Sequence, residues 1–347
     1  MQRVRQALMD LVDPSTIPSA SVSVWVEGQE RLREARGAAR LTPHRVATPD
    51  TPYDLASVTK PFAGGAVAAA LVQAGRLALD APVARWLPDV PAGITARHLL
   101  QHAAGYPAWA PLYEGIDREA WGQATAREQL LRVARRTPLV YAPGEGHTYS
   151  DLGFLTLLAL LEAAGEAPID ELLQRHVLTP ADVDLRWGWA EAAATEDCPV
   201  RGEVVQGEVH DLNCLAMGGR STHAGLFGTA SEVGRLTVAL LDAAHGKRHD
   251  LPDLGPFWRG RGPGSHRLGW DGVSVGAYTS TGKAWPLDGV GHLGYTGTSV
   301  WVAPSERVVA VLLTNRVHPV DDKAPIRAAR PRFHDAIAAE LGWLPRT

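Results

Sequence analysis

The sequence predicts an α/β protein whose sheet is built from both ends of the chain, with a mainly helical segment inserted between them. A strand-like alternation of side chains appears at 20–27, and strand patterns return only near the end of the chain. Between them the composition turns rich in alanine and leucine at helical spacing. We therefore expect a sheet domain formed by 1–61 together with 255–347, and a mainly helical domain formed by 62–254.

The N-terminal region predicts a short helix followed by a hairpin. Apolar residues at helical spacing indicate a helix that ends before Pro14. The strand at 20–27 (ASVSVWVE) leads to a turn at Gly28, after which 31–39 can return beside it.

The rest of the chain predicts helices separated by loops rich in proline and glycine, and then a second hairpin. The helical candidates are 62–75, 95–102, 126–136, 152–164, 168–177 and 230–244. The loop 254–264 (LGPFWRGRGPG) marks a border. After it, 298–303 (TSVWVA) and 308–314 (VVAVLLT) form a buried hairpin, and a closing helix is expected at 325–342.

Composition and charge indicate a globular protein and exclude several classes. The 347 residues are 45% hydrophobic and 21% charged, with a net charge of -4, so no basic surface for nucleic acid is expected. The N-terminus carries no apolar run of signal-peptide length, and the longest apolar stretches are too short to span a bilayer. Cys198 and Cys214, the only cysteines, are expected to be reduced, and the predicted location is the cytoplasm.

Two motifs with known functional meanings lack the context that those functions need. Residues 289–294 match the GxGxxG pattern of dinucleotide-binding proteins, but a strand-like segment follows where a helix should begin. His98 and His102 have the spacing of a zinc-binding pair without the glutamate of HExxH, which favours packing or capping roles. A zinc hydrolase built on these two histidines stays an alternative that metal analysis would test.

The segment 55–62 (LASVTKPF) places a hydroxyl at Ser57 and an amine at Lys60, one helical turn apart. A serine is a weak nucleophile until a neighbouring base takes its proton. Bringing a lysine pKa from about 10.4 to near 7 costs roughly 4.5 kcal/mol, and the apolar helix after Lys60 could supply the necessary burial. Pro61 is tolerated because the first N–H groups of a helix have no partner within it. The alternative is that Ser57 only caps a helix and Lys60 is solvated.

Two further segments carry side chains suited to chemistry. Tyr149 lies between a loop and the helix predicted at 152–164, a junction where sites are often built. The segment 291–298 (GHLGYTGT) is expected to run along the edge strand of the sheet.

These segments, in this order, resemble the serine hydrolases of the β-lactamase and penicillin-binding-protein superfamily, especially the class C-like branch with its esterases and D-amino-acid peptidases. The resemblance covers nearly the whole chain. It is carried by DLASVTKPF (54–62), GRLALDAPVARWLPD (75–89), ARHLLQHAAGYP (96–107), APGEGHTYSDLGF (142–154), HAGLFGTASEVGRL (223–236) and GHLGYTGTSVWVAPSERVVAVLLTNR (291–316). It implies an antiparallel sheet flanked by N- and C-terminal helices, an all-helical insertion domain, and an active site in the cleft between them.

Taken residue by residue, the resemblance implies a reaction through an acyl-enzyme without a cofactor or metal. Ser57 is the implied nucleophile and Lys60 its proton acceptor. Tyr149 would pass the proton to the leaving group and later help to activate water. The backbone N–H groups of Ser57 and Tyr295 form the implied oxyanion hole, in which the loss of one donor typically costs about 10²- to 10³-fold in rate.

Asp151, His292 and Gly294 are the implied substrate-binding residues, and the first two depart from the family pattern. Asp151 stands where an asparagine is common, and an ionised carboxylate cannot donate a hydrogen bond to a substrate carbonyl. His292 stands where a lysine is common, and an imidazole is mostly uncharged at neutral pH. Both changes favour a hydrolase of esters or small amides. The alternatives are a slow penicillin-binding or cell-wall-fragment-binding protein, and a true β-lactamase or DD-carboxypeptidase.

The expected partner is a small-molecule ester or amide, without nucleic acid and without a membrane span. Trp109 and Tyr113 could line the cleft, although packing roles are equally compatible with their positions. Asp211 and His223 lie in a polar loop and are expected to be structural.

Overall fold

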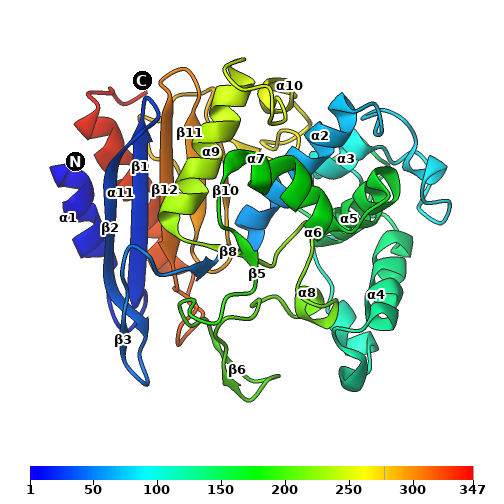
Figure 1. Cartoon of the computed structure of the whole chain (residues 1–347), viewed down its shortest axis with the longest axis horizontal. Coiled ribbons are helices and arrows are strands. Elements are labelled where there is room, and N and C mark those ends of the chain that lie inside the picture. Colours follow the sequence, from blue (N-terminus) through cyan, green and yellow to red (C-terminus); the bar gives the residue numbers. More distant parts are fainter. Residues whose placement is uncertain (277, 347) are drawn as a thin grey trace.

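The computed structural model describes residues 1–276 and 278–346, and its largest element is a seven-stranded antiparallel sheet (Figure 1). The strand order is β3-β2-β1-β12-β11-β10-β9. The strands are β1 (Ser19–Val26), β2 (Gln29–Arg40), β3 (Arg45–Val46), β9 (Asp271–Gly272), β10 (Val290–Leu293), β11 (Ser299–Ala303) and β12 (Val308–Thr314). Strand β1 pairs with β12 along its length, from Ala20 opposite Thr314 to Val26 opposite Val308. The predicted sheet, built from both ends of the chain, is confirmed.

Helices cover both faces of this sheet because β11 and β12 carry buried apolar side chains on both sides. On one face, α1 (Gln2–Leu11) and α11 (Ala324–Glu340) pack together over Val22, Val24 and Leu312. On the other face, α9 (Ala230–Ala244) packs against β1 and β12 (Figure 1).

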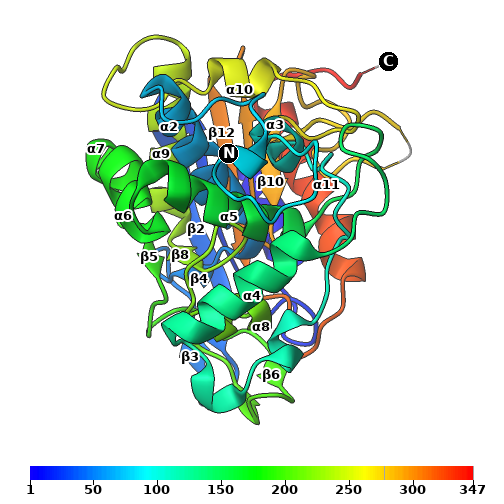
Figure 2. The ribbon, with the colours of Figure 1, turned by 90° about the vertical axis from the view of Figure 1, so that its right-hand side faces the viewer.

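The remaining helices form the second part of the molecule, seen on the right of Figure 1 and facing the viewer in Figure 2. Its central helix is α5, which is apolar and buried along most of its length. The helices are α2 (Val67–Gln73), α3 (Ala96–Leu100), α4 (Ala124–Arg136), α5 (Asp151–Gly165), α6 (Ile169–Leu173), α7 (Thr179–Ala181), α8 (Leu212–Ala216) and α10 (Gly255–Arg259). Short strands β4 (Tyr53–Asp54), β5 (Arg186–Trp187) and β8 (Leu226–Gly228) form a three-stranded sheet, and β6 (Asp197–Cys198) pairs with β7 (Glu203–Val204).

The division into a sheet domain and a helical domain at residues 61 and 254 stays a prediction. Helix α9 falls inside the predicted helical segment but packs on the sheet, because its apolar face meets the side of β12 that α1 and α11 leave uncovered. In the part of the chain that the structure describes, no single helix has the length and apolar character to cross a bilayer. Asp151–Gly165 and Ile169–Ala181 meet that criterion only as a pair bent by 73°.

Two local predictions differ from the structure, and both concern the site. The helix predicted from residue 62 begins instead as a 3₁₀ turn at Ala56–Val58 and a π-helical segment at Lys60–Ala66 before α2. Pro61 has no N–H to donate there. The segment 291–298, expected to run along the edge strand, is a strand only where it belongs to β10. β10 is not the edge of the sheet, because β9 pairs with its outer side.

Candidate active site

Ser57 lies in the 3₁₀ turn at the start of the first long helical segment, and its backbone is set by the residue before it. Ala56 has a φ of 47°, a left-handed conformation that costs a non-glycine residue roughly 1 kcal/mol. The Ala56 N–H donates to Asp54 Oδ1 at 2.7 Å, and Asp54 Oδ2 accepts the His210 N–H at 2.7 Å. The buried carboxylate of Asp54 therefore holds the turn that presents Ser57.

Lys60 is fully buried beneath Ser57 and makes three hydrogen bonds. Its Nζ donates to Ser57 Oγ at 3.0 Å, to Asp151 Oδ1 at 2.6 Å and to the His223 carbonyl at 3.2 Å. Burial lowers the pKa of Lys60, but the charge of Asp151 and the contacts with Asp151 and Tyr149 outweigh it, so the pKa is raised. The sequence predicted the burial but not the ion pair, and Lys60 is therefore protonated in the resting site.

Tyr149 lies beside this pair at the loop that leads into α5. The Lys60 Nζ is 4.9 Å from the centre of its ring. Burial raises the pKa of Tyr149, and the positive charge of Lys60 only partly offsets it, so the phenol keeps its proton at neutral pH. The next residue, Ser150, caps α5 by accepting the Gly153 N–H at 3.0 Å.

The turn between β10 and β11 is bonded to the segment that carries Ser57. Thr296 Oγ1 donates to the Asp54 carbonyl and Thr298 Oγ1 to the Leu55 carbonyl, both at 2.8 Å. A Cβ on Gly294 would lie 1.9 Å from Thr298 Oγ1 and 2.5 Å from the Leu55 carbonyl oxygen, so only glycine permits this approach. The approach places Tyr295 next to the Ser57 turn.

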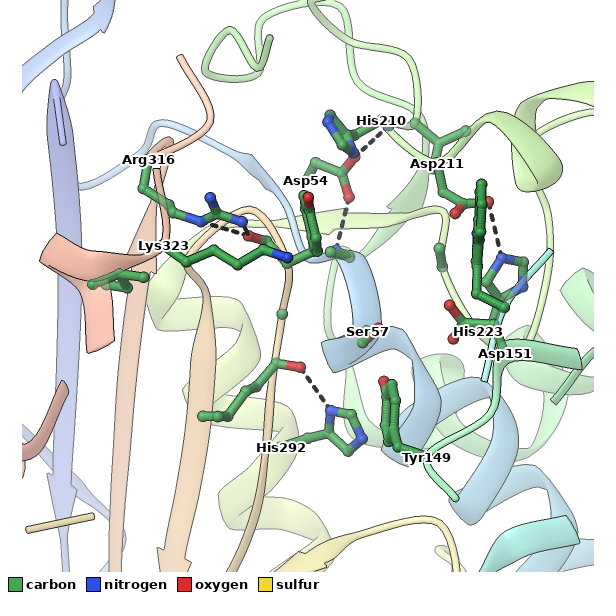
Figure 3. Close-up of a pocket in the computed structure, with 18 of the residues that line it drawn as sticks. Asp54, Ser57, Tyr149, Asp151, His210, Asp211, His223, His292, Arg316 and Lys323 are labelled. Atoms are coloured by element: carbon green, nitrogen blue, oxygen red, sulfur yellow. Dashed lines mark hydrogen bonds and ion pairs between the residues drawn. The ribbon is translucent and has the colours of Figure 1, made fainter. Parts of the chain in front are cut away.

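The predicted site residues other than Lys60, which is buried beneath Ser57, line one pocket of about 820 Å³. Its lining includes Ser57, Tyr149, Asp151, His292, Gly294 and Tyr295, and also Trp109 and Tyr113. Figure 3 shows Ser57 between Asp151, Asp211 and His223 on one side and Arg316 and Lys323 on the other, with Tyr149 and His292 below it. Among the turn, loop and cap hydrogen bonds of the described residues, none is donated by the Ser57 or the Tyr295 N–H. These two donors can therefore bind a substrate carbonyl oxygen.

Asp211 and His223 form a polar support behind Lys60. Asp211 Oδ1 accepts the Cys214 N–H at 2.7 Å as the cap of α8, and it lies 3.0 Å from His223 Nε2. Burial raises the pKa of Asp211, but the contacts with His223 and the capped N–H overcome it and bring the pKa to about 2. The carbonyl of His223 then accepts from Lys60.

Sequence reasoning missed a group of buried histidines beside Tyr149. His102 lies with its ring centre 4.5 Å from that of Tyr149 and 4.6 Å from that of His266. His292 is 6.0 Å from His266 by the same measure. Burial lowers the pKa of His102, His266 and His292, so these rings are neutral. Histidines within loops of small residues, as in QHAAG and GSHRLG, were the signal available in the sequence.

These three histidines are the group in the described part of the chain whose ligand atoms lie close enough to hold a metal ion, within 4.8 Å of one another. The tautomer of His102 does not fit. His102 Nδ1 accepts the Ser150 N–H at 3.0 Å, so the neutral ring carries its proton on Nε2 and offers no lone pair to a metal ion. His98 is not part of the group, because α3 ends at Leu100 and His102 has a φ of 56°.

A serine hydroxyl bonded to a buried lysine, beside a phenol and at the edge of a pocket, is an arrangement typical of serine hydrolases. The sequence profile of the family described as Beta-lactamase matches residues 4–331, and the chain belongs to this family. The resemblance seen in the sequence is confirmed.

The comparisons with single proteins agree with this placement. A “Putative D-alanyl-D-alanine carboxypeptidase” of Salmonella agona is 28% identical over 94% of this chain and 85% of that protein. Among solved structures, EstCE1, a hydrolase with promiscuous acyltransferase activity, aligns with a TM-score of 0.77 at 22% identity, covering 97% of each chain. The D-amino acid amidase of Ochrobactrum anthropi SV3 aligns with a TM-score of 0.74 at 21% identity, covering 98% of this chain and 99% of that one. The two solved structures share the fold.

Proposed function

We propose that this serine hydrolase acylates Ser57 with an ester or a small amide and then hydrolyses the acyl-enzyme. The observation that supports the proposal most directly is the 3.0 Å hydrogen bond between Ser57 Oγ and the buried Lys60 Nζ, at the floor of a pocket lined by two free N–H groups. In this scheme the substrate carbonyl oxygen lies between the N–H groups of Ser57 and Tyr295.

The proton follows the chain of contacts. The reactive form is the one in which the Lys60–Asp151 pair has lost a proton, so that the Lys60 amine is neutral. Ser57 Oγ then bonds to the carbonyl carbon, and the proton of the Ser57 hydroxyl passes to Lys60 Nζ. Asp151 then stabilises the ammonium group at 2.6 Å. Tyr149 donates its hydroxyl proton to the leaving group as the carbon bond to that group breaks, and Lys60 restores it. Water attacks the acyl group by the reverse path and releases the acid.

A peptide-like amide with a carboxylate is the second candidate substrate. Lys323 and Arg327 line the pocket rim and are exposed, and neither has a carboxylate within 4.0 Å among the described residues. Their charges favour a substrate with an anionic end. The name of the Salmonella relative and the amidase structure are consistent with such substrates.

One panel of substrates separates the ester-hydrolysing, amide-hydrolysing and β-lactam-hydrolysing classes. It compares short-chain esters, D- and L-aminoacyl anilides, a D-Ala-D-Ala peptide and a chromogenic cephalosporin. The cytoplasmic location stays a prediction.

Substitution of the nucleophile tests the proposal. Ser57→Ala is expected to abolish labelling by a serine-reactive fluorophosphonate and the turnover of p-nitrophenyl esters. Ser305→Ala changes an exposed serine in the turn between β11 and β12 and should keep both. Wild-type ester turnover by Ser57→Ala would show that the nucleophile lies elsewhere.

A further inference from the structure

Arg330, on α11, carries a buried charge that the reaction scheme above does not use. Its side chain is 6% exposed, and no carboxylate lies within 4.0 Å of it in the described ranges 1–276 and 278–346. Burial lowers the pKa of Arg330 to about 10, so the guanidinium is still charged at neutral pH. A buried charge without an opposite charge weakens a fold, which indicates that this one has another use.

The hydrogen bonds of Arg330 go to the turn that forms the oxyanion hole. Its Nη2 donates to the Gly294 carbonyl at 2.9 Å and to the Thr298 carbonyl at 2.7 Å. The Gly294 carbonyl and the Tyr295 N–H belong to the same peptide unit. Because that unit is conjugated, a cation on its oxygen draws electron density from its nitrogen and makes the N–H a stronger donor.

The position of the turn does not depend on Arg330 alone. Thr296 and Thr298 bind it to the Ser57 segment through their hydroxyl groups, as described above. Arg316 Nε donates to the next carbonyl, that of Tyr295, at 2.8 Å. Arg316 also forms an ion pair with Asp321, so its charge is compensated. The distinct contribution of Arg330 is therefore an uncompensated positive charge at the Gly294–Tyr295 peptide.

We propose that Arg330 is a positioning residue of the oxyanion hole, whose guanidinium strengthens the Tyr295 N–H through the Gly294 carbonyl. The proposal rests on the assignment of Ser57 and Tyr295 to the site. The substrate carbonyl carries a full negative charge only in the tetrahedral intermediate, so the effect is expected in kcat and in the binding of tetrahedral anions, with KM little changed.

The test compares variants at position 330 with a matched change on the same helix. Arg330→Gln removes the charge and keeps an amide donor, and Arg330→Lys keeps the charge. Arg332→Gln removes an exposed charge on α11 that neither lines the pocket nor is bonded to the turn. For each we would measure kcat and KM for a p-nitrophenyl ester, the affinity for a boronic acid that forms a tetrahedral adduct, and thermal unfolding.

Because complete loss of an oxyanion donor costs about 10²- to 10³-fold, weakening one is expected to lower kcat by about 10-fold in Arg330→Gln. Boronic acid affinity should fall in parallel, with KM within about 3-fold. Arg330→Lys should keep more of both, and Arg332→Gln should keep the wild-type kcat and boronic acid affinity. If the glutamine variant does not fold, the lysine variant carries the test: its kcat and its boronic acid affinity should fall together, and wild-type values of both would overturn the proposal.

The proposal is overturned if a folded variant at 330 loses kcat without losing boronic acid affinity, changes KM alone, or keeps both kcat and affinity without the charge. Fluorophosphonate labelling of Ser57 separates this failure from a failure of the proposed function. If labelling is lost in Ser57→Ala while the variants at position 330 keep the wild-type kcat, the proposed function stands and only the role of Arg330 is refuted.

Discussion

Asp151→Asn should move the acid limb of the pH–rate profile to lower pH. Asp151 raises the pKa of Lys60 by its charge and hydrogen bond, against the lowering effect of burial. It also raises the pKa of Tyr149, where burial is the larger cause. Since the carboxylate raises both values, the direction of the change does not depend on which of the two groups is the base.

The magnitude follows from the contact. Two unit charges 2.6 Å apart interact by roughly 6 kcal/mol at an effective dielectric constant of about 20. Water reaches Asp151, which is 19% exposed, and the carboxamide keeps a dipole toward Lys60. A nearby opposite charge typically changes a pKa by about 1 to 3 units, and we expect about 1 to 2 units here, or about 1.4 to 2.8 kcal/mol.

The assay is kcat/KM for an uncharged p-nitrophenyl ester between pH 5 and 10, with spontaneous hydrolysis subtracted. In the wild type, activity should still be rising at the alkaline end of this range, because the pKa values of Lys60 and Tyr149 are raised above their usual values. In Asp151→Asn the rise should come about 1 to 2 units earlier. Glu196→Gln is the control, because Glu196 lines the pocket but pairs with His210 at 3.4 Å. An acid limb that stays in place or moves to higher pH in Asp151→Asn would refute the reasoning.

Two further predictions concern stability. His102→Leu removes the acceptor of the buried Ser150 N–H and should cost about 1–3 kcal/mol in urea unfolding, with lower activity because Tyr149 loses its neighbour; an equal loss in His98→Leu would contradict the role of that bond. The pKa of Asp211 is about 2 in the folded chain against a usual 3.8, so its carboxylate stabilises the fold above pH 4 by about 2 kcal/mol, a contribution lost as the pH falls toward 2. Asp211→Asn should therefore flatten the fall in unfolding free energy over that range, and an unchanged slope would argue against it.

The sequence predicted those elements whose pattern is local. The helix at 230–244 and the strand at 308–314 agree with α9 and β12 residue for residue, because each has a clear apolar period and a turn at its ends. The start of the helix after Ser57 was not predictable. Its π-helical winding depends on packing, since a Cβ on Gly64 would lie 2.8 Å from the ring of Phe154.

The site was predictable to the extent that its residues belong to linked motifs. Ser57, Lys60 and Tyr149 were identified in this way, and the structure brings them together. The ion pair between Lys60 and Asp151 was not predicted, because it joins residues 91 positions apart and depends on how α5 meets the Ser57 turn. Reading Asp151 only as a substrate ligand therefore missed its bond to the lysine.

Arg330 left a signal in the sequence that was not used. In the closing helix, Ile326, Arg330, Phe333 and Ile337 follow one another at helical spacing, and all four are buried. An arginine within an otherwise apolar stripe is unusual, because burying a charge is costly. Such a position in a predicted helix indicates a buried bond to backbone or to a ligand.

The pairing of β1 with β12 sets the order in which the protein can mature during synthesis. Residues 19–26 leave the ribosome early, but their partner strand, 308–314, emerges almost three hundred residues later. Until then β1 can pair only with β2, and the turn that carries Tyr295 cannot dock beside Ser57. Contacts of such long sequence separation form slowly and leave apolar strands exposed for a time. A nascent chain thus carries Ser57 long before it has a complete pocket, and its apolar strands lack their partner until the last part of the chain is made.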